Sequence, residues 1–293
     1  MTSPQKLLKN GNLHASKRLG QNFLKDPSTA ETIVARARIL PEDVVLEIGA
    51  GLGALTLPLA RIARKVYAVE KDLPVAALLK NEIDRHRIDT VDILNKNILD
   101  LDLRALSGHE RRKLLVVGNL PYNISSQILV RLIGERASVS RCILMFQKEL
   151  VVRICAPPGG RSYGRLSAML AYCATVRKIA DVNAALFFPR PKVDSQVIEI
   201  EFTEQPDFPA DDETFLFRVI KAAFSKRRKM LRNTLAGGEL DIDLKTAKDS
   251  LEKARIDPTR RAETLTVEEF VRLSNTIYRS SAIDTVRSPS MLT

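Results

Sequence analysis

Short apolar runs alternate with helix-length stretches over the first half of the chain. The runs are VVLEI, VYAVE, TVDIL, LLVVG and CILMF, at residues 44–48, 66–70, 90–94, 114–118 and 142–146. Strands that are buried on both faces read as continuous apolar runs, and long crossovers between them are typical of parallel pairing. The pattern therefore predicts a parallel sheet wrapped by helices.

The pattern changes after residue 150. Residues 163–176 show helical spacing, residues 196–202 (QVIEIEF) predict one more strand, and residues 204–213 are polar with two prolines, which is typical of a domain boundary. Helical spacing returns in residues 216–224 and 265–278. We expect a loose basic N-terminal arm (1–16), an α/β domain (17–205), a small helical domain (206–280) and a flexible tail (281–293).

The chain is basic, with 46 Lys and Arg residues against 35 Asp and Glu residues and a formal charge of +11. The bases gather in two acid-free stretches, residues 1–25 and residues 221–232. Such stretches favour a polyanionic partner, although a basic run can also be an ordinary solvated helix face. Phe224, Met230 and Leu231 interrupt the second stretch, which predicts a helix anchored by apolar side chains with its charges outward.

Cysteine usage and hydropathy narrow the class of protein. Cys142, Cys155 and Cys173 are too few and too widely spaced for a zinc site or a disulfide framework, so we expect reduced core thiols and no metal. No apolar stretch approaches the length of a membrane span, and the N-terminus lacks the apolar core of a signal peptide. A cytoplasmic protein without a membrane partner is expected, and a monomer is the simplest state.

A glycine-rich turn follows the first predicted strand. Gly49, Gly51 and Gly53 permit a tight turn and the close approach of a ligand to the backbone. Glu70 ends the next strand, where a carboxylate can accept hydrogen bonds from both ribose hydroxyls. The pattern predicts a nucleoside site. Gly49, Gly51 and Ala54 also satisfy the dinucleotide-binding pattern, so the glycines alone leave a nicotinamide-dependent oxidoreductase open.

The stretch GNLPYNISSQ, residues 118–127, follows a predicted buried strand. An adenine amine is a poor nucleophile because its lone pair is delocalised into the ring. Two acceptors for its N–H groups would localise that pair, and the Asn119 amide oxygen and the Leu120 carbonyl are candidates, since Pro121 restricts Leu120 to extended conformations. Tyr122 can stack on the base. The alternative is an ordinary turn in which Asn119 and Pro121 only end the strand.

Six motifs in order carry a family resemblance: KRLGQNFLKD (17–26), LEIGAGLGALT (46–56), GNLPYNISS (118–126), FQKELVVR (146–153), YGRLS (163–167) and FFPRPKVDS (187–195). From Lys17 to Ser274 the chain resembles the bacterial small-subunit ribosomal RNA adenine dimethyltransferases. The resemblance implies a Rossmann-like class I methyltransferase domain with a small C-terminal helical domain and S-adenosyl-L-methionine as cofactor. It implies as substrate two adjacent adenines, in a hairpin loop near the 3′ end of 16S ribosomal RNA within an immature small subunit, each methylated twice.

The resemblance also implies roles for single residues. Gln21, Asn22 and Leu24 would close over the methionine end of the cofactor, beside Gly49, Gly51, Glu70 and Asn119. Asn97 stands where the family usually has an aspartate that accepts from the cofactor's adenine amine, and Asp100 is the alternative. Phe187 would sandwich the target adenine from the side opposite Tyr122; core packing is the competing interpretation, and Phe188 is the more doubtful partner. Candidate phosphate contacts are Arg18, Lys221, Lys226, Arg227, Arg228, Lys229 and Arg232.

Other functions remain to be weighed. An assembly or RNA-binding factor with lost catalysis would share the basic stretches, but the intact NLPY and Glu70 favour activity. The related erythromycin-resistance methyltransferases act on large-subunit RNA, and Leu120 with residues 54–56 favours the small subunit. A DNA adenine methyltransferase shares the amine chemistry without the FFPRPKVDS and KRLGQNFL motifs. The nicotinamide interpretation explains neither these motifs nor GNLPY.

Overall fold

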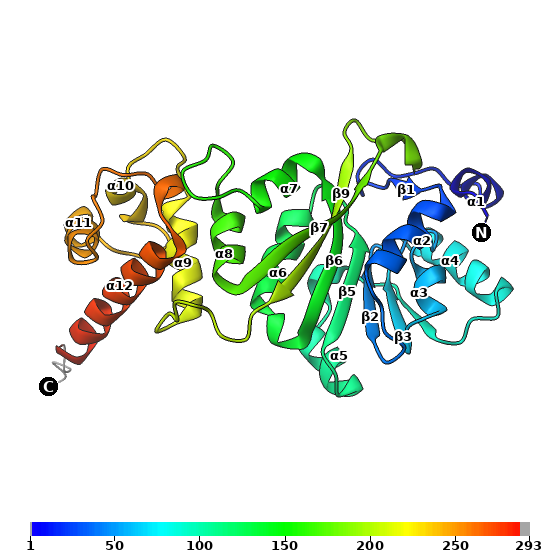
Figure 1. Ribbon diagram of the computed structural model, residues 1–293, viewed down its shortest axis with the longest axis horizontal. Coiled ribbons are helices and arrows are strands. Elements are labelled where there is room, and N and C mark those ends of the chain that lie inside the picture. The colour runs from blue at the N-terminus through cyan, green and yellow to red at the C-terminus, as the bar shows by residue number, and fades with distance from the viewer. Residues whose placement is uncertain (1, 288–293) are drawn as a thin grey trace, which may run out of the picture. The chain divides into compact units, whose positions relative to one another are not determined.

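The computed structural model describes the backbone of residues 2–287 and the side chains of residues 2–280 (Figure 1). The chain divides into two compact units: residues 1–151 with 175–202, and residues 152–174 with 203–293. Residues 152–174, which the sequence assigned to the α/β domain, group with the second unit because Tyr172 packs edge to face on Phe217 and donates a hydrogen bond to Glu213 (3.0 Å).

Apart from Ala174 at the start of β7, the first unit holds the strands of the described residues. They are β1 (Phe23–Leu24), β2 (Val44–Ile48), β3 (Lys65–Val69), β4 (Val91–Leu94), β5 (Leu114–Asn119), β6 (Val139–Gln147), β7 (Ala174–Val182), β8 (Phe187–Phe188) and β9 (Ser195–Phe202). Its helices are α1 (Pro4–Asn10), α2 (Pro27–Arg36), α3 (Thr56–Ala60), α4 (Leu73–Arg85), α5 (Leu103–Glu110) and α6 (Ser125–Gly134), with short 3₁₀ turns η1 (Ile98–Asp100), η2 (Arg136–Ser138) and η3 (Ala184–Leu186). Helix α7 (Lys148–Ile154) leads into the second unit.

Seven strands form one sheet in the order β4-β3-β2-β5-β6-β9-β7, and several appear as adjacent arrows in Figure 1. Strands β4, β3, β2, β5 and β6 are parallel, as the sequence predicted. Strand β9, whose direction the sequence left open, pairs antiparallel with β6, so the complete sheet is mixed. The sequence missed β7, because Ala174–Val176 continue the apolar spacing of the preceding helix.

The central strands are buried on both faces. Alternate residues, such as Val45, Val117 and Ile143, share one apolar cluster with α2 and α3. The residues between them, such as Leu46 and Val116, are also fully buried. Because both faces of these strands are buried, apolar residues do not alternate with polar ones, which explains the continuous apolar runs in the sequence.

The first residues form a helix rather than the loose arm that the sequence predicted. Ser3 caps α1 by accepting from the Lys6 N–H, and Pro4 stands at the first helical position, where its missing N–H costs no hydrogen bond. Leu7 and Leu8 are buried against a cluster that includes Phe23. Their burial supplies the packing that a helix this short needs to persist.

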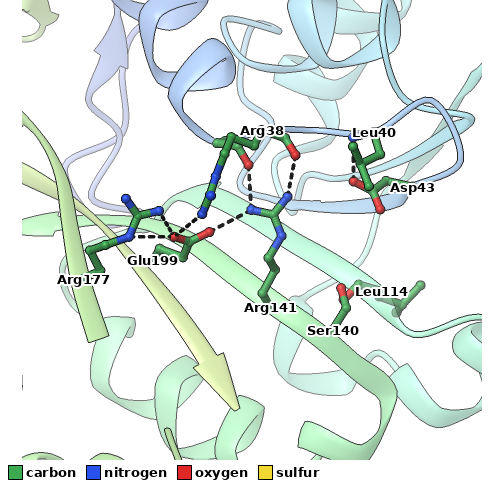
Figure 2. Close-up of polar contacts among 9 residues, drawn as sticks. Arg38, Leu40, Asp43, Leu114, Ser140, Arg141, Arg177 and Glu199 are labelled. Carbon is green, nitrogen blue, oxygen red and sulfur yellow. Dashed lines mark hydrogen bonds and ion pairs between the residues drawn. The ribbon is translucent and has the colours of Figure 1, made fainter. Parts of the chain in front are cut away.

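A carboxylate on β9 binds three arginines (Figure 2). Glu199 is 2% exposed; its Oε1 accepts from Arg141 (2.8 Å), and its Oε2 accepts from Arg177 (3.1 Å from Nε) and Arg38 (3.4 Å). Burial alone would raise the pKa of this carboxyl, but the arginine hydrogen bonds hold it below its usual value. Arg141 also donates to the carbonyls of Ala37 (2.6 Å) and Arg38 (2.7 Å). The cluster therefore fastens the end of α2 to β6 and β9.

The second unit is helical within the described residues. It contains α8 (Arg165–Cys173), α9 (Glu213–Ala223), α10 (Leu231–Leu235), α11 (Leu244–Lys253), the turn η4 (Ala262–Thr264) and α12 (Val267–Arg287). The predicted tail begins inside α12, and its residues 288–293 lie outside the described part of the chain. None of the helices in residues 2–287 is long and apolar enough to cross a lipid bilayer. Cys142 and Cys173 are buried, whereas Cys155 is exposed, contrary to the expected core position.

Candidate active site

A cavity of about 420 Å³ lies in the first unit, at the carboxyl ends of β2, β3 and β5. Strand β2 pairs with β3 on one side and β5 on the other, so the order of the sheet reverses there. Ligands of open α/β sheets bind at such a switch point. Every residue that the sequence analysis assigned to the cofactor lines this cavity, and so do four further candidates, Arg18, Leu120, Pro121 and Tyr122.

The glycine turn and Glu70 form one wall. Gly49 and Gly51 have left-handed backbone conformations, with φ of 73° and 55°, which only glycine adopts without strain. The Glu70 carboxylate accepts from the N–H groups of Gly51 (2.9 Å) and Asp72 (2.8 Å) and is 8% exposed. Burial raises the pKa of Glu70, while these two backbone donors oppose the rise. The carboxylate is thus held in the cavity wall.

A second buried carboxylate in this wall was missed by the sequence analysis. Glu47 lines the cavity two residues before Gly49, is 2% exposed and accepts from the Thr56 hydroxyl (2.6 Å). Burial raises its pKa to about 8. The signal was present in the sequence, because an acid inside an apolar strand that ends at a glycine turn calls for an explanation beyond packing.

The N-terminal segment covers the same cavity. Gln21 donates to the Asp72 carboxylate (2.7 Å) and accepts from the Ser16 N–H (2.7 Å), so both ends of its amide are engaged. Asn22 donates to the Gly20 carbonyl (3.1 Å). Leu24 is buried and packs in the core cluster below the turn. These contacts fix the segment against the start of α4.

Asn97 lines the cavity beyond the end of β4, whereas Asp100 is exposed and does not line it. The Asn97 oxygen accepts from the Leu99 N–H (3.3 Å), which caps the turn η1. The Asn97 amide is therefore held at the cavity by a fixed turn and can form further hydrogen bonds there. The alternative position, Asp100, is not supported.

Asn119 ends β5 and points its amide into the cavity wall. Its nitrogen donates to the backbone carbonyl of Asn22 (2.9 Å), which leaves the side-chain oxygen as the acceptor. Leu120 donates its N–H to Met145 (3.3 Å), and within the described residues no hydrogen bond reaches the Leu120 carbonyl. Two acceptors, one from a side chain and one from the backbone, are thus available at adjacent residues.

Tyr122 follows on the same loop and is half-buried. Its hydroxyl lies 3.2 Å from the hydroxyl of Ser195, which is fully buried at the start of β9. Burial raises the pKa of Tyr122, so the hydroxyl stays protonated. The contact joins two motifs that are about 70 residues apart in the sequence, and the sequence analysis did not foresee Ser195 as the partner.

Phe187 is not brought to the cavity. It is 1% exposed and packs in the core cluster with residues such as Leu24 and Val197. The structure thus gives Phe187 the core packing that was the competing interpretation. Its neighbour Phe188 is half-buried and lies outside this cavity too.

The sequence predicted one helix for the second basic stretch. The structure shows the end of α9, an exposed turn and the start of α10 instead. Phe224 anchors it through ring contacts with Tyr163 and Phe270, and Leu231 is buried, while Met230 is 39% exposed. The helix is interrupted because four consecutive basic residues supply no apolar face for a further turn. The charges nevertheless face outward at this basic turn, which we define as residues 226–229.

The candidate phosphate contacts differ in their exposure and in whether another residue already binds them. Lys221 forms an ion pair with Glu239 (2.6 Å), Arg227 donates to the Arg161 carbonyl (2.5 Å), and Arg232 is only half-exposed. Lys226, Arg228 and Lys229 are exposed and form no ion pair with any described residue. Arg18 is exposed at the rim of the cavity in the first unit.

The family described as Ribosomal RNA adenine dimethylase matches residues 12–278. The chain is 57% identical over 278 residues to the Ribosomal RNA small subunit methyltransferase A of Desulforapulum autotrophicum, covering 95% of this chain and 97% of that protein. It is 42% identical over 276 residues to the protein of the same name from Magnetococcus marinus, with coverages of 94% and 96%.

Two solved structures are similar. A dimethyladenosine transferase from Plasmodium falciparum matches with a TM-score of 0.70 and 26% identity, covering 86% of this chain and 95% of that one. The 23S rRNA methyltransferase ErmE matches with a TM-score of 0.61 and 23% identity, covering 87% and 99%, and that likeness concerns the fold alone. Together with the observed sheet, these matches confirm the predicted Rossmann-like α/β fold with a C-terminal helical domain.

Proposed function

The chain belongs to the ribosomal RNA adenine dimethylase family, and we propose on this premise that it dimethylates the N6 amines of two adjacent adenines near the 3′ end of 16S ribosomal RNA. The methyl donor is S-adenosyl-L-methionine, and the substrate is an immature small ribosomal subunit in the cytoplasm. The protein acts as a monomer. The observation that carries the proposal is the pair of acceptors, the Asn119 oxygen and the Leu120 carbonyl, at the edge of a nucleoside-sized cavity.

The two acceptors act on the target amine. In the first transfer each takes a hydrogen bond from one N–H of the adenine, so the nitrogen becomes tetrahedral and its lone pair points into the cavity. In the second transfer the monomethylated amine has one N–H left and donates it to one of the two acceptors. These bonds strengthen as the nitrogen becomes positive, and they therefore stabilise the transition state more than the ground state. No titrating base is needed, because the positively charged product nitrogen can release its proton to water.

The residues of the cavity fit a cationic nucleoside cofactor. Glu70 lies in its wall beside Glu47, which its raised pKa of about 8 keeps protonated near neutral pH, and the glycine turn brings backbone within reach of the ligand. The Glu70 carboxylate would attract a cation and repel a pyrophosphate, which disfavours a nicotinamide dinucleotide. S-adenosyl-L-methionine, when bound, supplies a methyl group that is electrophilic because it is attached to a sulfonium. Glu70 would hold the ribose hydroxyls and Asn97 the adenine amine.

Tyr122 positions the flipped base. The ring is half-buried and its hydroxyl is held beside Ser195, so its face has a fixed orientation on the catalytic loop. Stacking on such a ring contributes about 1 to 3 kcal/mol per base, comparable to the few kcal/mol lost on leaving the stack. The basic turn and Arg18 provide phosphate contacts that are independent of sequence.

The proposal is tested by nucleoside mass spectrometry. Purified protein and S-adenosyl-L-methionine are incubated in parallel with immature small subunits, large-subunit RNA and adenine-containing DNA. We expect N6,N6-dimethyladenosine from the small subunit alone. Methylation of large-subunit RNA or DNA instead would overturn the substrate assignment. Tight, salt-sensitive binding to the small subunit without methylation would favour an assembly factor.

A further inference from the structure

A second cavity of about 420 Å³ lies in the first unit. Its walls come from α1, the segment that follows α1, and β8 with the residue after it. None of its residues lines the cavity that contains Asn119, so the two are separate. The proposed reaction gives this second cavity no role.

The two cavities share one structural wall. Strands β1 and β8 pair antiparallel, with Phe23 opposite Phe188. Phe23 lines the active-site cavity, and Phe188 lines the second one. Opposed residues of an antiparallel pair lie only about 4.5 to 5.5 Å apart between Cα atoms. Only one residue pair therefore separates the two cavities at this point, so the nucleotide next to one held in the active site is the nearest candidate occupant of the second cavity.

The lining has the chemistry that recognises a single-stranded base. Phe188 offers a half-buried ring and Leu8 a buried apolar floor, while the exposed amide of Asn12 can both donate and accept. Lys9 and His14 are exposed at the wall, and no acidic side chain lines the cavity. Aromatic stacking combined with cations and an amide is the usual means of binding unpaired RNA bases. An uncharged apolar peptide would leave Lys9 without a counter-charge.

We propose that the second cavity holds a nucleobase of the substrate RNA adjacent to the target adenine, stacked on Phe188 with a phosphate near Lys9. The inference rests on the proposed function. Because the substrate contains two adjacent adenines, the neighbour of each target is itself a target. The second cavity holds one adenine out of the stack while the other presents its amine to Asn119.

The test uses an RNA hairpin of the substrate loop with 2-aminopurine in place of one adenine or the other. Stacking on an aromatic ring quenches this base. Because 2-aminopurine has no amine at position 6, the remaining adenine is the target that occupies the active site beside Tyr122, and the probe occupies the neighbouring position. In the wild-type protein we therefore expect quenching of the probe, and in Phe188→Ala and Phe188→Leu we expect it to be lost. RNA binding should weaken about tenfold, as for the loss of one stacked base. Phe188→Tyr should retain both signals.

Controls separate this inference from folding and from the proposed function. Phe208→Ala removes a ring that is 43% exposed in the second unit and should leave the quenching intact. Cofactor binding by calorimetry should be unchanged in every Phe188 variant, because Phe188 does not line the active-site cavity. If Phe188→Ala fails to fold, Lys9→Ala carries the test and should flatten the salt dependence of RNA binding by about one phosphate contact.

The outcomes are distinct. If the wild type methylates the small subunit but quenching and affinity persist in Phe188→Ala, Phe188→Leu and Lys9→Ala, the second cavity does not hold a base and the inference is overturned alone. If the wild type methylates no RNA at all, the proposed function fails, whatever the fluorescence shows.

Discussion

The amide nitrogen of Asn119 donates to the backbone carbonyl of Asn22 across 2.9 Å, although the two residues are 97 positions apart. The bond orients the catalytic amide, because a rotated amide would place its oxygen against the Asn22 carbonyl. It also links the N-terminal segment at the cavity to the loop that carries Tyr122. In the proposed function, the segment over the cofactor and the loop that presents the amine are therefore connected by one hydrogen bond.

Asn119→Ala should lower kcat by about 10²- to 10³-fold, the usual cost of removing one group that stabilises transition-state charge. Cofactor affinity should fall much less than kcat, since Glu70 and the glycine turn remain and only the bond to Asn22 is lost. Single-turnover methylation and calorimetry measure the two effects. The matched control is Asn123→Ala, which removes an exposed amide on the same loop as Asn119; that amide donates to the backbone carbonyl of Arg18 (3.3 Å). An equal loss of rate in both variants would argue against a specific role for Asn119.

Tyr122→Ala and Tyr122→Phe separate stacking from hydrogen bonding. The alanine variant loses the ring, so kcat/KM should fall by about 5- to 150-fold, which corresponds to 1 to 3 kcal/mol of stacking. The phenylalanine variant keeps the ring and loses only the contact with Ser195, so it should retain most of the activity. An inactive phenylalanine variant would mean that the hydroxyl, rather than the ring face, is what the reaction needs.

The sequence predicted those features that depend on neighbouring residues and missed those that depend on contacts between distant segments. The strands that end at Ile48, Val69 and Asn119 were predicted because each is a continuous apolar run next to a turn. The cavity at their ends followed from their parallel order. Strand β7 was missed because its first residues extend a helical pattern, and only its pairing with β9 at the sheet edge makes it a strand.

The site shows the same limit. Motifs placed Glu70, Asn97 and Asn119 at one cavity, because Glu70 directly follows β3, Asn119 ends β5 and Asn97 lies in the loop after β4. Contacts between distant segments could not be foreseen, and the hydroxyl pair of Tyr122 and Ser195 is one of them. The position of Phe187 in the core also depends on long-range pairing, since β8 forms only by pairing with β1.

Glu47 predicts a pH dependence of stability. Burial raises its pKa in the folded protein to about 8, above the ordinary value of 4.5, so the native state keeps a proton that the unfolded chain releases between these values. The free energy of unfolding should therefore fall as pH rises from about 5 to 8. The Glu47→Gln variant has a neutral side chain at every pH, so its free energy of unfolding should fall less over this range. Denaturant unfolding at several pH values measures the free energy. If it falls equally steeply with pH in both proteins, the raised pKa of Glu47 is contradicted.

Asn97→Asp should tighten cofactor binding by about fivefold. A carboxylate accepts a stronger, charge-assisted hydrogen bond than an amide, and it attracts the cation of the cofactor. The local turn should survive, because aspartate caps the Leu99 N–H as well as asparagine does. Calorimetry with S-adenosyl-L-methionine measures the change. Unaltered affinity would indicate that this side chain does not contact the cofactor.

The basic turn is tested by its salt dependence. Lys226, Arg228 and Lys229 are the exposed members without ion pairs among the described residues, so replacing all three by Gln should weaken RNA binding and reduce the slope of log K against log[salt]. The magnitude of this slope should fall by about 0.7 to 0.9 for each phosphate contact that is removed. Replacing Arg104 in the first turn of α5 together with Arg111 and Arg112 just after its end, all three exposed, removes the same charge elsewhere. A similar loss in both triple variants would mean that only net charge matters, because a specific contact at residues 226–229 would distinguish them.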